Sequence, residues 1–178
     1  MKHVLSAITL GAGLCLASVA SHAAPIFTFS QTGFSGGGSL TGSFSGSDLD
    51  NDGQLSSFQG EIIGYSMSFS GDTLISDFSH TFSDLAGLVY DLGSGFLGDG
   101  SGGDTEGVAS NWLGVTGFDY ASGLGPVLGF GGRVIDTATG ATSATQNLVV
   151  VAQVPEPASL ALLSLGLAGL AVIRRKSA

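Results

Sequence analysis

The sequence predicts an all-β protein: a single antiparallel β-sandwich, jelly-roll-like, that lies between an N-terminal signal peptide and a C-terminal transmembrane helix. Three observations support this fold class. Several short segments alternate apolar and polar residues, which is the pattern of half-buried strands. Clusters of Gly, Ser and Asp separate these segments at short intervals. No segment before Pro155 keeps a 3.6-residue period over three turns, so the sequence predicts no helix in this region.

The expected strands follow one another along the middle of the chain. The clearest is residues 65–69, Tyr-Ser-Met-Ser-Phe, in which apolar and polar side chains alternate strictly. Short, frequent strands with many turn signals favour a sandwich or a barrel. The other segments with strand character are residues 26–29, 39–44, 77–82, 88–90, 127–134 and 148–151.

The N-terminus has the composition of a secretory signal peptide, residues 1–23. Lys2 supplies the positive charge, residues 4–20 are mostly apolar, and Ser21-His22-Ala23 places small residues where signal peptidase requires them. We expect cleavage between Ala23 and Ala24, because a cut one residue later would put Pro25 next to the scissile bond. The body of the protein is then residues 24–153.

The last 25 residues, 154–178, form a segment in three parts. Its prolines restrict the backbone, so the first part is expected to be extended rather than helical. The apolar part has 16 residues, or about 24 Å of helix. The basic residues at its end mark the cytoplasmic side by the positive-inside rule. The three parts are the motif Val154, Pro155, Glu156 and Pro157, the apolar helix 158–173, and the stop-transfer residues Arg174, Arg175 and Lys176.

These three parts together resemble the PEP-CTERM sorting signal of proteins exported by Gram-negative bacteria. The resemblance implies that an exosortase-type membrane protease is a partner and that it removes the tail. It also implies an intermediate anchored in the inner membrane and facing the periplasm, followed by release to the cell surface or the extracellular space. The alternative from the residues alone is a permanent single-span anchor, in which the prolines only begin the helix.

The charge of the body excludes one class of partner. Residues 24–153 contain 13 of the 14 acids but only one basic residue, Arg133, which gives a net charge of −12. Such a surface repels the phosphate backbone, so we expect no nucleic-acid partner. It attracts divalent cations, although a high net charge also serves solubility without any ligand. The one cysteine, Cys15, lies in the signal peptide, which excludes disulfides and thiolate sites in the body.

The best candidate site is the segment Asp48-Leu49-Asp50-Asn51-Asp52-Gly53-Gln54-Leu55. Three carboxylates at alternate positions, followed by a glycine that permits a sharp turn, resemble the first half of the calcium loop of EF-hand and dockerin proteins. The twelfth position is Gln59 rather than a bidentate Glu, and Glu61 lies two residues further on. The resemblance implies weak Ca²⁺ binding, whereas the alternative is an acidic turn between strands. The candidate metal ligands are Asp48, Asp50, Asp52 and Gln54.

Other features are weaker candidates. The acidic loop 98–106 resembles one copy of a β-roll calcium repeat, but a solvated loop is the simpler interpretation. His80 is the only histidine of the body, and we expect it on a strand face with Phe78 and Phe82, partly buried rather than acting as a general base. The aromatic residues Trp112, Phe118 and Tyr120 suit either the core or a sugar-binding face.

The sequence favours a non-enzymatic protein of the cell surface or extracellular matrix that is sorted through its tail. The alternative is a calcium-dependent carbohydrate-binding module of the exopolysaccharide matrix, with extracellular polysaccharide as its partner. A hydrolase is a third hypothesis, but the acids do not single out a catalytic pair, and no Gly-x-Ser-x-Gly motif stands at a strand-to-helix turn.

Overall fold

The computed structural model describes residues 23–100, 106–112, 114, 116–123 and 131–155. The described residues form twelve strands and two single-turn 3₁₀ helices, η1 (Ser57–Gln59) and η2 (Phe82–Asp84). The strands are β1 (Ile26–Gln31), β2 (Leu40–Gly46), β3 (Gln54–Ser56), β4 (Ile62–Phe69), β5 (Phe78–Thr81), β6 (Leu85–Asp91), β7 (Phe96–Leu97), β8 (Gly107–Ser110), β9 (Phe118–Ser122), β10 (Gly132–Asp136), β11 (Thr142–Thr145) and β12 (Val149–Val154).

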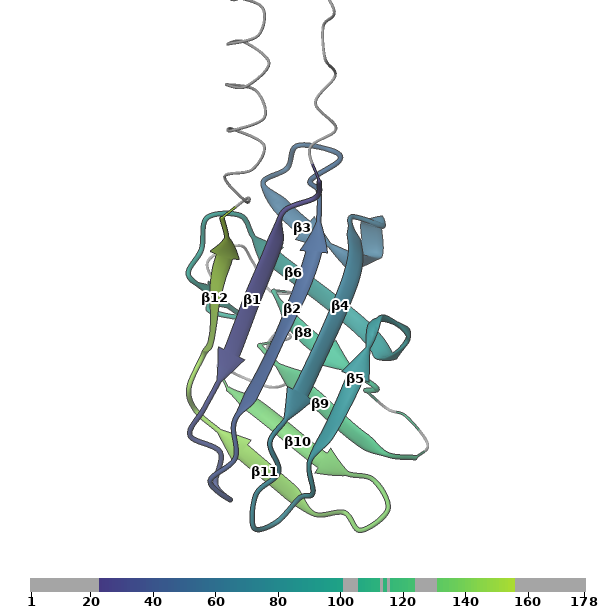
Figure 1. The fold of residues 1–178 in the computed structure, drawn as a ribbon, viewed down its shortest axis with the longest axis vertical. Coiled ribbons are helices and arrows are strands. Elements are labelled where there is room, and N and C mark those ends of the chain that lie inside the picture. The colour runs from purple at the N-terminus through teal and green to yellow at the C-terminus, as the bar shows by residue number, and fades with distance from the viewer. Residues whose placement is uncertain (1–22, 101–105, 113, 115, 124–130, 156–178) are drawn as a thin grey trace, which may run out of the picture.

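The strands form two antiparallel six-stranded sheets, which confirms the all-β expectation and is consistent with a β-sandwich (Figure 1). The first sheet has the order β5-β4-β2-β1-β12-β7, and the second has the order β11-β10-β9-β8-β6-β3. The first strand β1 lies between β2 and the last strand β12, so the beginning and the end of the body are hydrogen-bonded to each other. Ile26 pairs with Val154 at the end of this ladder.

Alternation of side chains explains how the first sheet builds its inner face. In β4, Tyr65, Met67 and Phe69 are buried, whereas Ser66 and Ser68 between them are exposed. Successive side chains of a strand point to opposite faces, so this sequence can bury its apolar residues on one side only. The register of β4 is therefore set by the sequence, as the 65–69 pattern predicted.

Aromatic rings fill the space between the sheets. Phe27 and Phe44 stack with ring centroids 5.0 Å apart, and Tyr90 of the second sheet lies 5.4 Å from Phe44 in an edge-to-face arrangement. Each such pair adds about 0.5–1.5 kcal/mol beyond the burial of its apolar area. Phe29 extends the cluster towards Tyr65. The core thus compensates for the many glycines, which contribute no side chain to packing.

Part of the interior is polar and fully hydrogen-bonded. Gln31 is only 1% exposed, and its amide donates to the Ser122 hydroxyl and to the carbonyl of Asn147. The Tyr120 hydroxyl donates to Gln31 Oε1 at 2.8 Å. A buried amide without partners would cost stability, so this network fixes how the two sheets align at this end.

The structure corrects two details of the expected strands. Residues 77–82 do not form one strand: β5 ends at Thr81, and Phe82 begins η2 with 49% of its surface exposed. Asp84 causes the change, because its carboxylate accepts the backbone N–H of Thr81 and caps the turn. Residues 127–130 of the expected strand 127–134 lie outside the described residues, and β10 begins at Gly132.

Both predicted targeting segments lie largely outside the described residues. This holds for the signal peptide up to residue 22 and for the tail from residue 156. Among the residues that the structure does describe, none belongs to a helix long and apolar enough to cross a membrane. The proposed cleavage position between Ala23 and Ala24 lies just before β1, where the chain has no regular secondary structure.

Candidate cation site and C-terminal motif

The acidic loop predicted from the sequence connects β2 to β3. It lies at the end of the sandwich where β1 begins and β12 ends (Figure 1). Asp48 organises the loop, because its Oδ1 accepts the backbone N–H of Asn51 at 2.7 Å and its Oδ2 accepts that of Gly53 at 3.1 Å. Asn51 and Gly53 have φ angles of 62° and 87°. This left-handed geometry is accessible to Asn and Gly, which explains the residue types at these positions.

The other two loop aspartates also accept bonds from nearby donors. Asp50 Oδ1 accepts the N–H of Asp52 at 3.2 Å, and Asp52 Oδ1 accepts that of Gln54 at 2.8 Å. Asp50 Oδ2 accepts the side-chain amide of Gln59 at 3.0 Å. The residue that replaces the expected bidentate Glu is thus hydrogen-bonded to a loop carboxylate. Leu55 is 1% exposed and anchors the loop to the core, as the sequence indicated.

Glu61 joins the two arms of the loop. Its side chain is 1% exposed, although it is a carboxylate. Oε1 accepts the N–H of Leu49 at 2.7 Å, and Oε2 accepts that of Ser56 at 2.8 Å. Hydrogen bonds from backbone N–H groups offset the cost of burying the charge. Helix η1 and Gly60, which has a φ of 79°, return the chain so that Glu61 reaches the loop.

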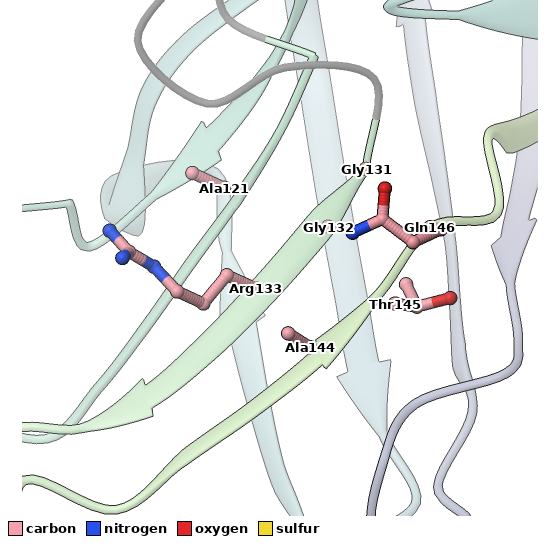
Figure 2. Close-up of a pocket in the computed structure, with 7 residues that line it drawn as sticks. All are labelled: Ala121, Gly131, Gly132, Arg133, Ala144, Thr145 and Gln146. Atoms are coloured by element: carbon pink, nitrogen blue, oxygen red, sulfur yellow. The ribbon is translucent and has the colours of Figure 1, made fainter.

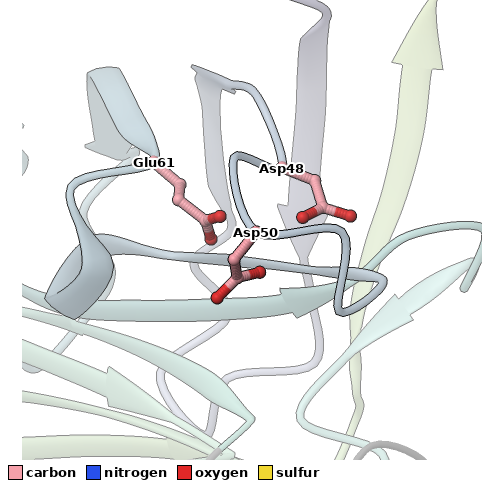
Figure 3. A group of neighbouring side chains, drawn as sticks. All are labelled: Asp48, Asp50 and Glu61. Carbon is pink, nitrogen blue, oxygen red and sulfur yellow. The ribbon is translucent and has the colours of Figure 1, made fainter.

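The structure brings together a carboxylate group that differs from the predicted one. One oxygen each of Asp48, Asp50 and Glu61 lie within 4.8 Å of one another, and Figure 3 shows the three side chains around the loop. Asp52 is outside this group, and the Gln54 amide donates to Asp91 Oδ1 at 2.8 Å. The predicted ligands Asp48 and Asp50 are therefore adjacent, whereas Asp52 and Gln54 point to other partners.

The donor set suits a hard divalent cation. It consists of carboxylate oxygens, the ligand type that Ca²⁺ and Mg²⁺ prefer. Each carboxylate oxygen has two lone pairs, so an oxygen that already accepts one N–H retains capacity for a metal. Partial desolvation raises the pKa of Asp50, and repulsion from Asp52, Glu61 and Asp48 raises it further. A bound cation would relieve this repulsion.

A second buried carboxylate stands in the loop after β7. Glu106 is 2% exposed, and its Oε2 accepts the N–H groups of Asp99 and Gly100 at 3.1 and 3.2 Å. Burial raises the pKa of Glu106 to about 6. Residues 101–105 lie outside the described residues, so the β-roll resemblance of 98–106 stays a prediction.

Of the remaining candidates, His80 and Tyr120 are buried, and Trp112 and Phe118 are partly buried. His80 is 8% exposed, and its Nδ1 lies 2.7 Å from the hydroxyl of Ser110, which is fully buried. Burial lowers the pKa of His80, which favours the neutral form of the ring. Tyr120 is completely buried, and Phe118 stacks on Phe78 at 4.7 Å. These two aromatic residues therefore belong to the core rather than to a sugar-binding face.

Comparison with family models identifies the C-terminal segment. Residues 153–176 match the PEP-CTERM protein-sorting motif. The chain therefore carries the tail of an exported protein that is anchored in the membrane during sorting and processed by exosortase. Val154, the first residue of the Val-Pro-Glu-Pro segment, is also the last residue of β12. No curated protein and no solved structure matches the chain.

Proposed function

We propose that residues 24–153 form a non-enzymatic module that is displayed at the cell surface or in the extracellular matrix after the tail is removed. The observation that carries this proposal is the sorting motif at residues 153–176, which begins where the last strand ends. Burial of His80 and Ser110 supports a module without acid–base chemistry. The net charge of −12 keeps such a module soluble once it is released.

Topology can be tested with a reporter fused after Gln153. Lys2 and the basic residues at 174–176 both favour the cytoplasmic side, which places the body in the periplasm. A periplasmic phosphatase at this position is expected to be active, and a cytoplasmic galactosidase inactive. The opposite pattern would contradict export.

A second function is a calcium-dependent carbohydrate-binding module, favoured by the grouping of Asp48, Asp50 and Glu61. If Ca²⁺ binds this group, a concentration of ~100 Kd stabilises the folded state by roughly 2.7 kcal/mol. That free energy corresponds to several degrees in Tm, since ~1 kcal/mol shifts Tm by about 2–8 °C. Mg²⁺ is expected to do less, because it requires octahedral geometry and releases water reluctantly.

Paired variants test the site. Asp50→Asn is expected to abolish the Ca²⁺-dependent shift in Tm. Asp77→Asn removes an equal charge from an exposed position before β5, so it should leave the shift intact. An unchanged wild-type melting curve between ~0.1 and ~10 mM Ca²⁺, a range that spans the affinity of extracellular modules, would show that the loop is only a turn.

A further inference from the structure

Arg133 is the only Lys or Arg of the body, and its Nε has no acceptor among the described residues. Its CZ atom lies 5.2 Å from the centroid of the Trp112 ring. Its Nε is buried and has no hydrogen-bond partner among the described residues. A buried N–H without an acceptor costs free energy, so this arginine is placed at a cost to stability.

The neighbours of Arg133 leave room beside it. On the outer face of the second sheet, Arg133 pairs with Ala121 of β9 on one side and with Ala144 of β11 on the other. The side chain of each neighbour is a single methyl group, so the aliphatic part of the Arg133 side chain lies beside small residues (Figure 2). A pocket of about 170 Å³ lies here, well above the ~10–15 Å³ that a single water needs.

The rest of the pocket is uncharged and polar. Gly131, Gly132, Thr145 and Gln146 complete its lining, and Gln146 is exposed. Figure 2 shows the guanidinium and the Gln146 amide on opposite sides of β10. Thr145 donates its hydroxyl to the carbonyl of Thr32, and Gln146 is the lining residue that carries a side-chain amide. A ligand that spans the pocket therefore meets a cation at one end and an amide at the other.

We propose that this pocket binds a carboxylate-bearing sugar, a hexuronate unit of an extracellular polysaccharide. A guanidinium presents a planar fork of N–H donors that matches a carboxylate in a bidentate arrangement. The Trp112 ring orients this fork before the ligand arrives, because a cation is attracted to the ring face. The sugar ring then lies over Ala121 and Ala144, and its hydroxyls reach the Gln146 amide.

The net negative charge of the body does not prevent an anion from binding at this site. A net charge of −12 repels anions at long range, but salt screens this repulsion beyond about 8 Å at physiological ionic strength. Asp119, the acid on the same face, pairs with Ile135, on the far side of Arg133 from Gly131 and Gln146. Its carboxylate also accepts the Asn111 amide at 3.2 Å. We therefore place the ligand on the side of Arg133 towards Gly131 and Gln146, where none of the pocket residues is acidic.

The choice of a sugar acid rests on the proposed role at the cell surface, whereas the carboxylate site itself does not. The test uses the full chain in mild detergent with a chelator present, so that calcium does not contribute. Glucuronate and galacturonate are titrated by calorimetry and by the fluorescence of Trp112, the only tryptophan of the chain. Acetate and glucose serve as the free carboxylate and the neutral sugar.

We expect uronates to bind more tightly than acetate, and glucose to give no signal. Arg133→Gln should weaken uronate binding at least tenfold, as loss of a charge-assisted bidentate pair implies, and Arg133→Lys should restore only part of it. A cooperative melting transition of each variant establishes that it folds. Equal binding of acetate and uronate, equal binding to the Gln variant, or no binding at all would overturn the proposal. None of these outcomes affects export or tail processing, which are measured separately.

Discussion

The buried carboxylate of Glu61 allows a direct test of how the acidic loop is held. Its two oxygens accept the N–H groups of Leu49 and Ser56 at 2.7 and 2.8 Å. A hydrogen bond to a charged group contributes about 1.5–3 kcal/mol. Glu61→Ala leaves both N–H groups without this acceptor, so we expect the free energy of unfolding to fall by about 3–5 kcal/mol.

Urea unfolding of the full chain, followed by Trp112 fluorescence, measures this loss. A chelator is present, so that any bound cation is excluded from the difference. Glu61→Gln is the matched variant: it preserves the shape and one carbonyl oxygen but sets an amide group against the second N–H. We expect it to lose about half as much stability as Glu61→Ala. If the free energy of unfolding of Glu61→Ala lies within ~0.5 kcal/mol of the wild-type value, a difference typical of surface substitutions, the Glu61 carboxylate does not hold the acidic loop.

Three further changes test other parts of the structure. Burial raises the pKa of Glu106 to about 6, above its usual 4.5, so the stability due to this group is complete below pH 4.5 and lost as the pH rises through 6. Denaturant melts from pH 4.5 to 7 should show Glu106→Gln gaining about 2 kcal/mol relative to wild type, and parallel profiles would contradict this. Gly42→Ala places a Cβ 2.2 Å from the Phe29 ring and should cost about 1–3 kcal/mol in thermal unfolding; an unchanged Tm would refute the close approach. Tyr120→Phe leaves Gln31 Oε1 without its donor and should cost about 1–2 kcal/mol by the same method, unless a water replaces the hydroxyl, which an unchanged Tm would reveal.

The strands that the sequence predicted most clearly are those with one buried face. In β4 and β1, alternating residues separate the inner and outer faces, so the pattern is visible without a structure. Strand β8 was not predicted, because Gly107 to Ser110 are all buried and nothing alternates. Strand β11 was also missed, since its buried residues Ser143 and Thr145 are polar. Their partners, such as the carbonyl of Thr32 for the Thr145 hydroxyl, are distant in sequence.

The candidate site was predicted only in part for a similar reason. Asp48 and Asp50 stand out because the aspartates are spaced as in a known loop. Glu61 falls outside that spacing, and the turn of η1 followed by the left-handed Gly60 brings it back. An acid directly before a strand that contains the strict alternation of residues 65–69 is a sequence signal that could have identified Glu61. The unsatisfied Nε of Arg133 has no local signal in the sequence, because it depends on which residues flank β10 in the sheet.

Intact-mass measurement of the protein from its native host tests the central claim most directly. The motif at residues 153–176 implies that the tail is removed after export. We expect a mature protein that begins at Ala24, ends near Pro155 and lacks the apolar run and the three basic residues. In the same host, Glu156→Ala should accumulate the uncleaved form. A mature wild-type protein that still ends at Ala178 would contradict processing and would instead indicate a permanent anchor.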